Sequence, residues 1–109
     1  LKARRADWIK LVSVWDKVVS YINDPKTQPD ALRIMAARAG VTPQAYKAFL
    51  GGTRLMSLAD NKAAMVKNNT FKSLYGSSYF VNQFNVSAGI YSKPEPVDAL
   101  IDPNIVLGK

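Results

Sequence analysis

The sequence WIKLVSVWDKVVSYI at residues 8–22 carries the clearest periodic pattern in the chain. Its apolar residues recur at intervals of three and four, which places them on one face of an α-helix. Pro25 ends the pattern, because proline cannot continue the hydrogen-bond ladder of a helix. We therefore predict one continuous helix from about Arg5 to Asn23, with the following residues buried: Trp8, Trp15, Val19 and Ile22.

Start and stop signals predict two helices directly after this one. Thr27 and Asp30 have a spacing similar to that of a capping box, and Gly40 is of the residue type that most easily adopts the left-handed conformation at a helix end. The pair Thr42-Pro43 combines an N-cap residue with a proline in the first turn, which predicts a third helix. The pair Gly51-Gly52 is expected to end it.

Two further helices and a tail complete the chain. Ser57 and Asp60 again resemble a capping box, and another helix is expected from about Lys72 to Phe84, although Gly76 inside it costs helix stability. No segment alternates between polar and apolar residues as a half-buried strand does. We predict an all-α architecture of about five helices in a single segment spanning residues 1–109. The end of this segment, residues 93–109, is expected to be an extended, proline-containing tail in which only residues 97–101 favour a helical turn.

Composition excludes several classes of protein and of site. The 109 residues are 48% hydrophobic, which excludes an intrinsically disordered tail, yet no stretch approaches the roughly 20 apolar residues of a membrane-spanning helix. Cys and His are both absent, so the commonest general base and the commonest metal ligands are missing. We expect no enzymatic activity, no catalytic residues, no metal site and no cofactor.

The charge balance favours an anionic partner. The net charge is +7, from 15 Lys and Arg against 8 Asp and Glu. These cations are spread thinly, whereas nucleic-acid binders usually cluster them beside aromatic side chains. The one cluster, formed by Lys2, Arg4 and Arg5, is expected to be solvated. The residues before Trp8 also lack an initiator Met and a secretory signal, so we expect an internal segment of a longer protein.

Three successive segments resemble a known family. They are residues 15–23 (WDKVVSYIN), 31–43 (ALRIMAARAGVTP) and 49–54 (FLGGTR). Downstream, residues 73–78 (SLYGSS), 83–86 (QFNV) and 101–103 (IDP), with Tyr91 and Lys93-Pro94, continue the series. In this order, the segments resemble the C-terminal third of the solute-binding proteins of ABC importers for nitrate, aliphatic sulfonates and taurine.

The resemblance implies a fold and a function. Members of that family are two-lobed α/β proteins of the periplasmic-binding-protein (type II) kind, with a ligand cleft between the lobes. The chain is then the C-terminal helical portion, and its partners are a small anionic solute, an upstream α/β lobe of the same protein and an ABC permease in the membrane. The implied location is periplasmic or extracytoplasmic. The strands that surround the cleft are missing here, so ligand-binding residues are unknown and none is transferred.

A second function stays open from the residues alone. The charge and the helical pattern also fit an autonomous basic module that binds nucleic acid or a protein partner. Binding that weakens steeply with salt would support the nucleic-acid version, because phosphate contacts release counterions. We favour solute capture, with no nucleic acid as partner, and expect the isolated chain to form a homodimer through its apolar face.

A few residues are candidates for a site, and each has a simpler interpretation. The loop Gly51-Gly52-Thr53-Arg54 offers bare amides and a guanidinium to an anion, but a glycine helix stop explains it better. Trp8 and Trp15 are better explained by packing than by ligand stacking. The pair Asp98 and Asp102 lacks a His partner for acid–base chemistry. The same is true of four candidate nucleophiles: Ser57, Ser73, Ser77 and Ser78.

Overall fold

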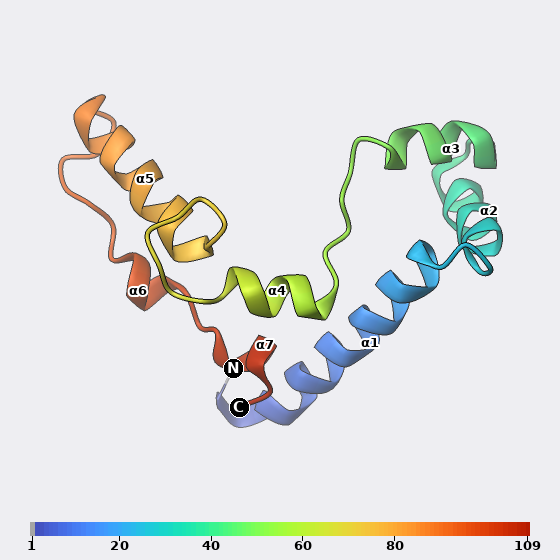
Figure 1. The fold of residues 1–109 in the computed structure, drawn as a ribbon, viewed down its shortest axis with the longest axis horizontal. Helices are drawn as coiled ribbons and strands as arrows, with labels where there is room; N and C mark the ends of the chain where they lie inside the picture. The colour runs from blue at the N-terminus through green and yellow to red at the C-terminus, as the bar shows by residue number, and fades with distance from the viewer. Residues whose placement is uncertain (1) are drawn as a thin grey trace. The chain divides into compact units, whose positions relative to one another are not determined.

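A computed structural model describes residues 2–109. The side chain of Lys2, which belongs to the predicted basic cluster, lies outside the described part. Within this range every regular element is a helix and there is no strand (Figure 1). This confirms the predicted all-α class. A short 3₁₀ helix at Lys2–Arg4 precedes seven α-helices: α1 (Arg5–Asn23), α2 (Gln28–Ala39), α3 (Pro43–Leu50), α4 (Leu58–Ala64), α5 (Leu74–Ser87), α6 (Val97–Leu100) and α7 (Asn104–Leu107).

The helices belong to two compact units, each of which is described by itself. One unit is continuous in sequence and contains residues 10–57. The other combines residues 1–9 with residues 58–109. None of the described helices combines the length and the apolar character that crossing a membrane requires.

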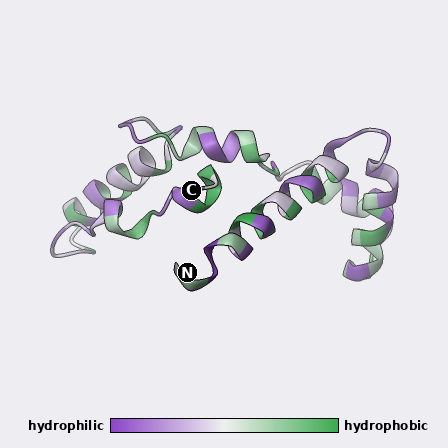
Figure 2. Ribbon diagram, turned by 90° about the horizontal axis from the view of Figure 1, so that it is seen from below, coloured by the Kyte–Doolittle hydropathy of each residue, from purple (hydrophilic) through white to green (hydrophobic). Residues whose placement is uncertain are grey.

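The long helix α1 has the predicted bounds, but only part of its apolar face is buried. Val19 and Ile22 are buried, with 1% and 9% of their surfaces exposed. Trp8 and Trp15 are 43% and 52% exposed, so the prediction that they are buried is wrong. Periodicity places residues on one face of a helix, but burial also needs a neighbouring element, and the described chain supplies one mainly at the C-terminal end of α1. Figure 2 shows apolar positions recurring between polar ones along this helix.

In the unit of residues 10–57, α2 and α3 pack against each other around a small core. The buried residues of α2 are Ala31, Leu32 and Ala36. Gly40 has φ 68° and ends α2 in the left-handed conformation, as predicted. The Thr42 hydroxyl accepts a hydrogen bond from the Ala45 amide at 3.2 Å, which confirms the predicted N-cap of α3.

The predicted capping box at the start of α2 is wrong. Thr27 has helical backbone angles, and its hydroxyl donates to the carbonyl oxygen of Tyr21 at 2.6 Å instead of accepting from its own helix. The Asp30 carboxylate accepts from the Tyr21 hydroxyl at 2.9 Å and from Arg33 at 2.7 Å. These local partners satisfy the side chains that a capping box would otherwise use. They also hold the pKa of Asp30 below its ordinary value, through the Arg33 hydrogen bond first and the Tyr21 hydrogen bond second.

In the unit of residues 1–9 and 58–109, α5 is the main element and the tail returns along it (Figure 1). Its buried residues are Tyr75, Gly76 and Asn82, and Val97 is buried at the start of α6. The tail contains α6 at the predicted position and also α7, which the sequence pattern does not predict. The Arg5 guanidinium donates to the backbone oxygen of Lys109 at 3.1 Å and to Asp102 at 3.3 Å, so the start of α1 contacts the end of the tail.

Candidate functional site

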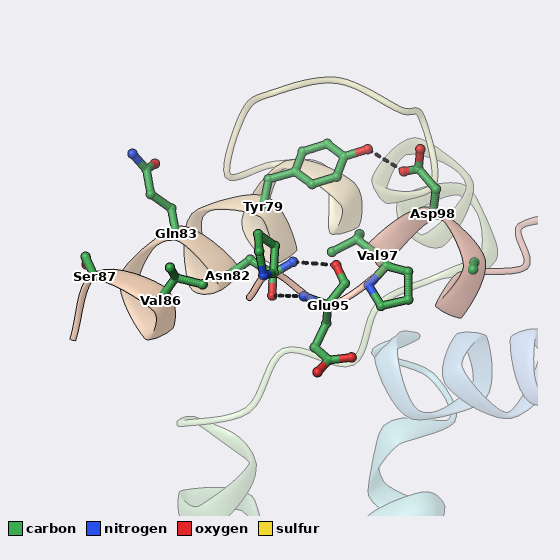
Figure 3. Close-up of a pocket in the computed structure, with 11 residues that line it drawn as sticks. Tyr79, Asn82, Gln83, Val86, Ser87, Glu95, Val97 and Asp98 are labelled. Atoms are coloured by element: carbon green, nitrogen blue, oxygen red, sulfur yellow. Dashed lines mark hydrogen bonds between the residues drawn. The ribbon is translucent and has the colours of Figure 1, made fainter. Parts of the chain in front are cut away.

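A cavity with a volume of about 710 Å³ lies between α5 and residues 94–99 of the tail (Figure 3). This volume is within the range of about 300–1,000 Å³ that is typical of small-molecule sites. The cavity is open to solvent on one side, and α5 forms the opposite wall from the tail. Its lining consists of Tyr79, Asn82, Gln83, Val86, Ser87, Pro94, Glu95, Pro96, Val97, Asp98 and Ala99.

The wall formed by α5 begins with a well-satisfied cap. The hydroxyl of Ser73, which is 1% exposed, donates to the carbonyl oxygen of Val66 at 2.7 Å and accepts from the Tyr75 amide at 3.2 Å. The first bond ties the start of α5 to the preceding loop, and the second satisfies one amide that the helix leaves unpaired. This fixes where α5 starts relative to its loop.

Asn82 joins the two walls of the cavity. Its amide nitrogen donates to the backbone oxygen of Glu95 at 2.8 Å, and its side-chain oxygen accepts from the Glu95 amide at 3.1 Å (Figure 3). These two hydrogen bonds bind the backbone amide and carbonyl oxygen of Glu95 in the same way as a neighbouring β-strand would. Asn82 is only 9% exposed, so little water competes for these bonds. Asn82 therefore holds the tail at a fixed distance from α5.

Asp98 makes a second connection across the same site. Its carboxylate accepts one hydrogen bond from Lys67 and one from the Tyr79 hydroxyl, each at 2.5 Å. The Lys67 bond first, and the Tyr79 bond second, hold the pKa of Asp98 below its ordinary value. The same contacts raise the pKa of Lys67 and of Tyr79, because each donor would lose its acceptor on giving up its proton. The Lys67 ammonium also lies 5.7 Å from the centre of the Tyr75 ring.

The chemistry available at this cavity is that of binding. Its acidic residues are Glu95 and Asp98, and the described lining has no Lys or Arg. Over residues 2–109 no group of three or more acidic side chains has the spacing of a metal site. The cavity suits an uncharged or cationic molecule better than an anion, because Glu95 adds a negative charge to its lining, and Lys67 is already paired with Asp98. It is therefore a poor place for a small anionic solute.

Several residues that the sequence suggests for a binding or catalytic site form hydrogen bonds within the chain instead. The amides of Gly51, Gly52 and Thr53 donate to carbonyl oxygens in the last turn of α3, so they are not free to cradle an anion. This confirms the helix-stop interpretation of the glycine loop. The two tail acids do not form a pair: Asp98 accepts from Lys67 and Tyr79, whereas Asp102 accepts from the Asn104 amide and contacts Arg5.

Two of the candidate serines and Asn82 have structural hydrogen-bond partners in this unit. Ser73 caps α5 and Ser77 donates to the Leu74 carbonyl oxygen at 3.1 Å, so both have structural partners. Asn82 is not identified from the sequence. Its partner, Glu95, is 13 residues away, and a single polar residue inside an apolar helix has no spacing that reveals such a bond.

Comparisons of the chain with models of known protein families, with curated proteins and with solved structures gave no match.

Proposed function

We propose that this chain is the helical C-terminal part of a solute-binding protein that captures a small anion, such as nitrate, taurine or an alkanesulfonate, for an ABC importer. The observation that carries the proposal is the ordered series of segments between residues 15 and 103 that resembles that family. The complete protein would be a two-lobed α/β protein of the type II kind, located in the periplasm or outside the cytoplasmic membrane, and its permease would receive the solute.

Two features of the described chain support this proposal. Large apolar side chains on several helices are exposed, including Leu11 (55%), Val81 (57%) and Phe84 (65%), as expected if a further lobe covers them. The cavity beside α5 has two carboxylates and no cation in its described lining, so it offers a small anion such as nitrate no charged partner. Both features fit a segment that completes a larger fold rather than one that binds the solute alone.

A thermal-shift experiment on two proteins tests the proposal. The complete gene product and the isolated 109-residue chain are each heated with nitrate, taurine, alkanesulfonates, bicarbonate and small aromatic acids. A ligand that binds only the folded state raises the melting temperature. We expect one of these anions to stabilise the complete protein, and the isolated chain to bind it only in the millimolar range, near −4 kcal/mol.

Two outcomes would contradict the proposal. The first is a complete gene product without an α/β lobe upstream of residue 1. The second is a micromolar dissociation constant for nitrate or taurine with the isolated chain, which would place the solute site within these residues. Arg54→Ala would then be the first variant to measure.

A further inference from the structure

A groove also lies in the unit of residues 10–57. It consists of two neighbouring cavities of about 450 Å³ and 220 Å³. Their linings share Ile22, Leu50, Thr53 and Leu55, so the two cavities adjoin along these residues. We call them together the α1–α3 groove, because helices α1, α2 and α3 and the segment after α3 form its walls.

The larger part of the α1–α3 groove is apolar. Its side chains come from three helices, and none of them carries a charge: the part not shared with the smaller cavity is lined by Trp15, Val18, Met35, Tyr46 and Phe49. Trp15 and Phe49 are more than half exposed, so they present ring surface to whatever enters. Covering such surface with an alkyl or aryl group is favourable, because it removes apolar area from water on both sides.

The smaller part of the groove has hydrogen-bond donors without partners. Lys47, Asn23 and Thr53 line it; all three are exposed, and their side chains make no hydrogen bond or ion pair within the described chain. Gln28 lines it too, but its amide nitrogen already donates to the Ile22 carbonyl oxygen at 3.1 Å. The described lining of both parts lacks Asp and Glu. An anion there would meet one cation and no carboxylate.

We propose that the α1–α3 groove binds a linear amphiphilic monoanion, an alkyl carboxylate, with its chain along Trp15 and Phe49 and its carboxylate at Lys47. This site lies within the described chain and does not depend on a second lobe, so it goes beyond capture of a small polar anion. A short carboxylate occupies only the polar part of the groove and therefore gains little binding free energy. A longer chain also covers the apolar part, so affinity is set mainly by chain length.

Tryptophan fluorescence and calorimetry test the proposal on the 109-residue chain. Trp8→Phe is the parent variant, so that Trp15 is the only tryptophan. Acetate, hexanoate, octanoate and decanoate are titrated below micelle-forming concentrations, with decanol and decyltrimethylammonium as uncharged and cationic probes. We expect a saturable change of Trp15 fluorescence, with the dissociation constant falling about fourfold for each added methylene.

Three substitutions separate the two parts of the groove from general charge attraction. Lys47→Gln should weaken decanoate binding by about threefold and leave decanol binding unchanged, because only the carboxylate loses its charged partner and Lys47 is exposed to solvent. Phe49→Ser should weaken both, and circular dichroism checks that this variant keeps its helices. Lys62→Gln, on α4 in the other unit, removes the same charge and should leave decanoate binding unchanged.

Several results would overturn the proposal. One is an affinity for carboxylates that does not depend on the length of their alkyl chain. Another is an equal loss of decanoate affinity in the Lys47 and Lys62 variants. Absence of decanoate binding by a chain that light scattering shows to be dimeric would mean that a second copy covers the groove. Binding to phosphatidylglycerol vesicles without binding to free decanoate would mean a membrane surface rather than a single-ligand site. Neither of the last two results bears on solute capture by the complete protein.

Discussion

Gly76 occupies a position in α5 that no other residue can take without moving the backbone. A Cβ atom there would lie 2.2 Å from the Thr70 carbonyl oxygen and 2.8 Å from that of Asn68. Both are backbone atoms of the loop before α5, so neither can rotate away. The glycine that lowers helix propensity is therefore what allows this loop to pack against the helix.

Gly76→Ala is expected to destabilise the chain by about 1–3 kcal/mol, because the loop must shift to accommodate the methyl group. Urea unfolding followed by circular dichroism measures the change. Gly52→Ala is the matched control, since a Cβ atom there meets its nearest neighbour, the Phe49 carbonyl oxygen, at an ordinary 3.7 Å. An equal effect of the two substitutions would show that the close contact at Gly76 is not formed in solution.

Trp15 and Val19 lie one turn apart on α1 and differ in burial. Trp15→Ala is expected to cost about 1 kcal/mol, well below the roughly 3–5 kcal/mol of a buried tryptophan, because half of its surface already contacts water. Val19→Ala should cost more, about 2 kcal/mol, although it removes fewer atoms. Unfolding free energies of both variants check the order. The reverse order would mean that Trp15 is covered, for example in a dimer.

Sequence periodicity predicts the orientation of Trp15 and Val19 but not their exposure. Both lie on the same predicted face, and both were expected to be buried. Burial depends on a second element that contacts this part of α1, and that element can be far away in the sequence or in another molecule. Caps such as Thr42 and Gly40 are predictable because their partners lie within a few residues.

At the scale of elements, Asn82 is the connection between α5 and the tail. Asn82→Ala removes both hydrogen bonds to Glu95. The backbone amide of Glu95 should then have no partner. We expect amide hydrogen exchange of residues 95–100 to become faster, with little change in residues 28–50. Gln83→Ala, which lines the same cavity without such bonds, is the control. Unchanged exchange in the Asn82 variant would show that the tail is held by other contacts.

Asp98 gives α6 a dependence on pH with a definite sign. The pKa of Asp98 is lower in the folded chain than in the unfolded one, because Lys67 and Tyr79 donate to its carboxylate. Its stabilising contribution is therefore present above about pH 4 and is lost as the pH falls through the folded pKa. The methyl NMR signals of Val97 should shift over this acidic range. In Asp98→Asn the shift should be absent, and a shift that persists would assign the transition to another acid.

The bounds of most helices follow from the sequence, whereas the connections between helices do not. The starts of α3 and α5 depend on Thr42 and Ser73, whose capping partners are two or three residues away. The contacts of Asp98 with Lys67 and Tyr79 span 31 and 19 residues. No local pattern marks such pairs. The cavity beside α5 therefore could not be predicted, although the helix that forms its wall could.

At the scale of the whole molecule, exposed apolar surface predicts self-association of the isolated chain. Leu11, Val81 and Phe84 are each more than half exposed, and burying such a side chain is worth about 1.5–3 kcal/mol. Light scattering over a concentration series should show a dimer or a larger species. Val81→Ser and Phe84→Ser should reduce this self-association. A monodisperse monomer at high concentration with a cooperative melt would show that the chain covers enough of its own apolar surface to be an independent domain.

The division of the chain into two units also affects the order in which they can be completed during synthesis. Residues 10–57 form their unit from one uninterrupted segment, so this unit can fold while the rest of the chain is still being translated. The other unit needs the contact between Arg5 and residues 102 and 109, which are separated by 97 and 104 positions. Ribosome-bound chains of increasing length, probed by proteolysis, should show residues 10–57 protected first. Arg5 can then form these two contacts only after the tail has left the ribosome.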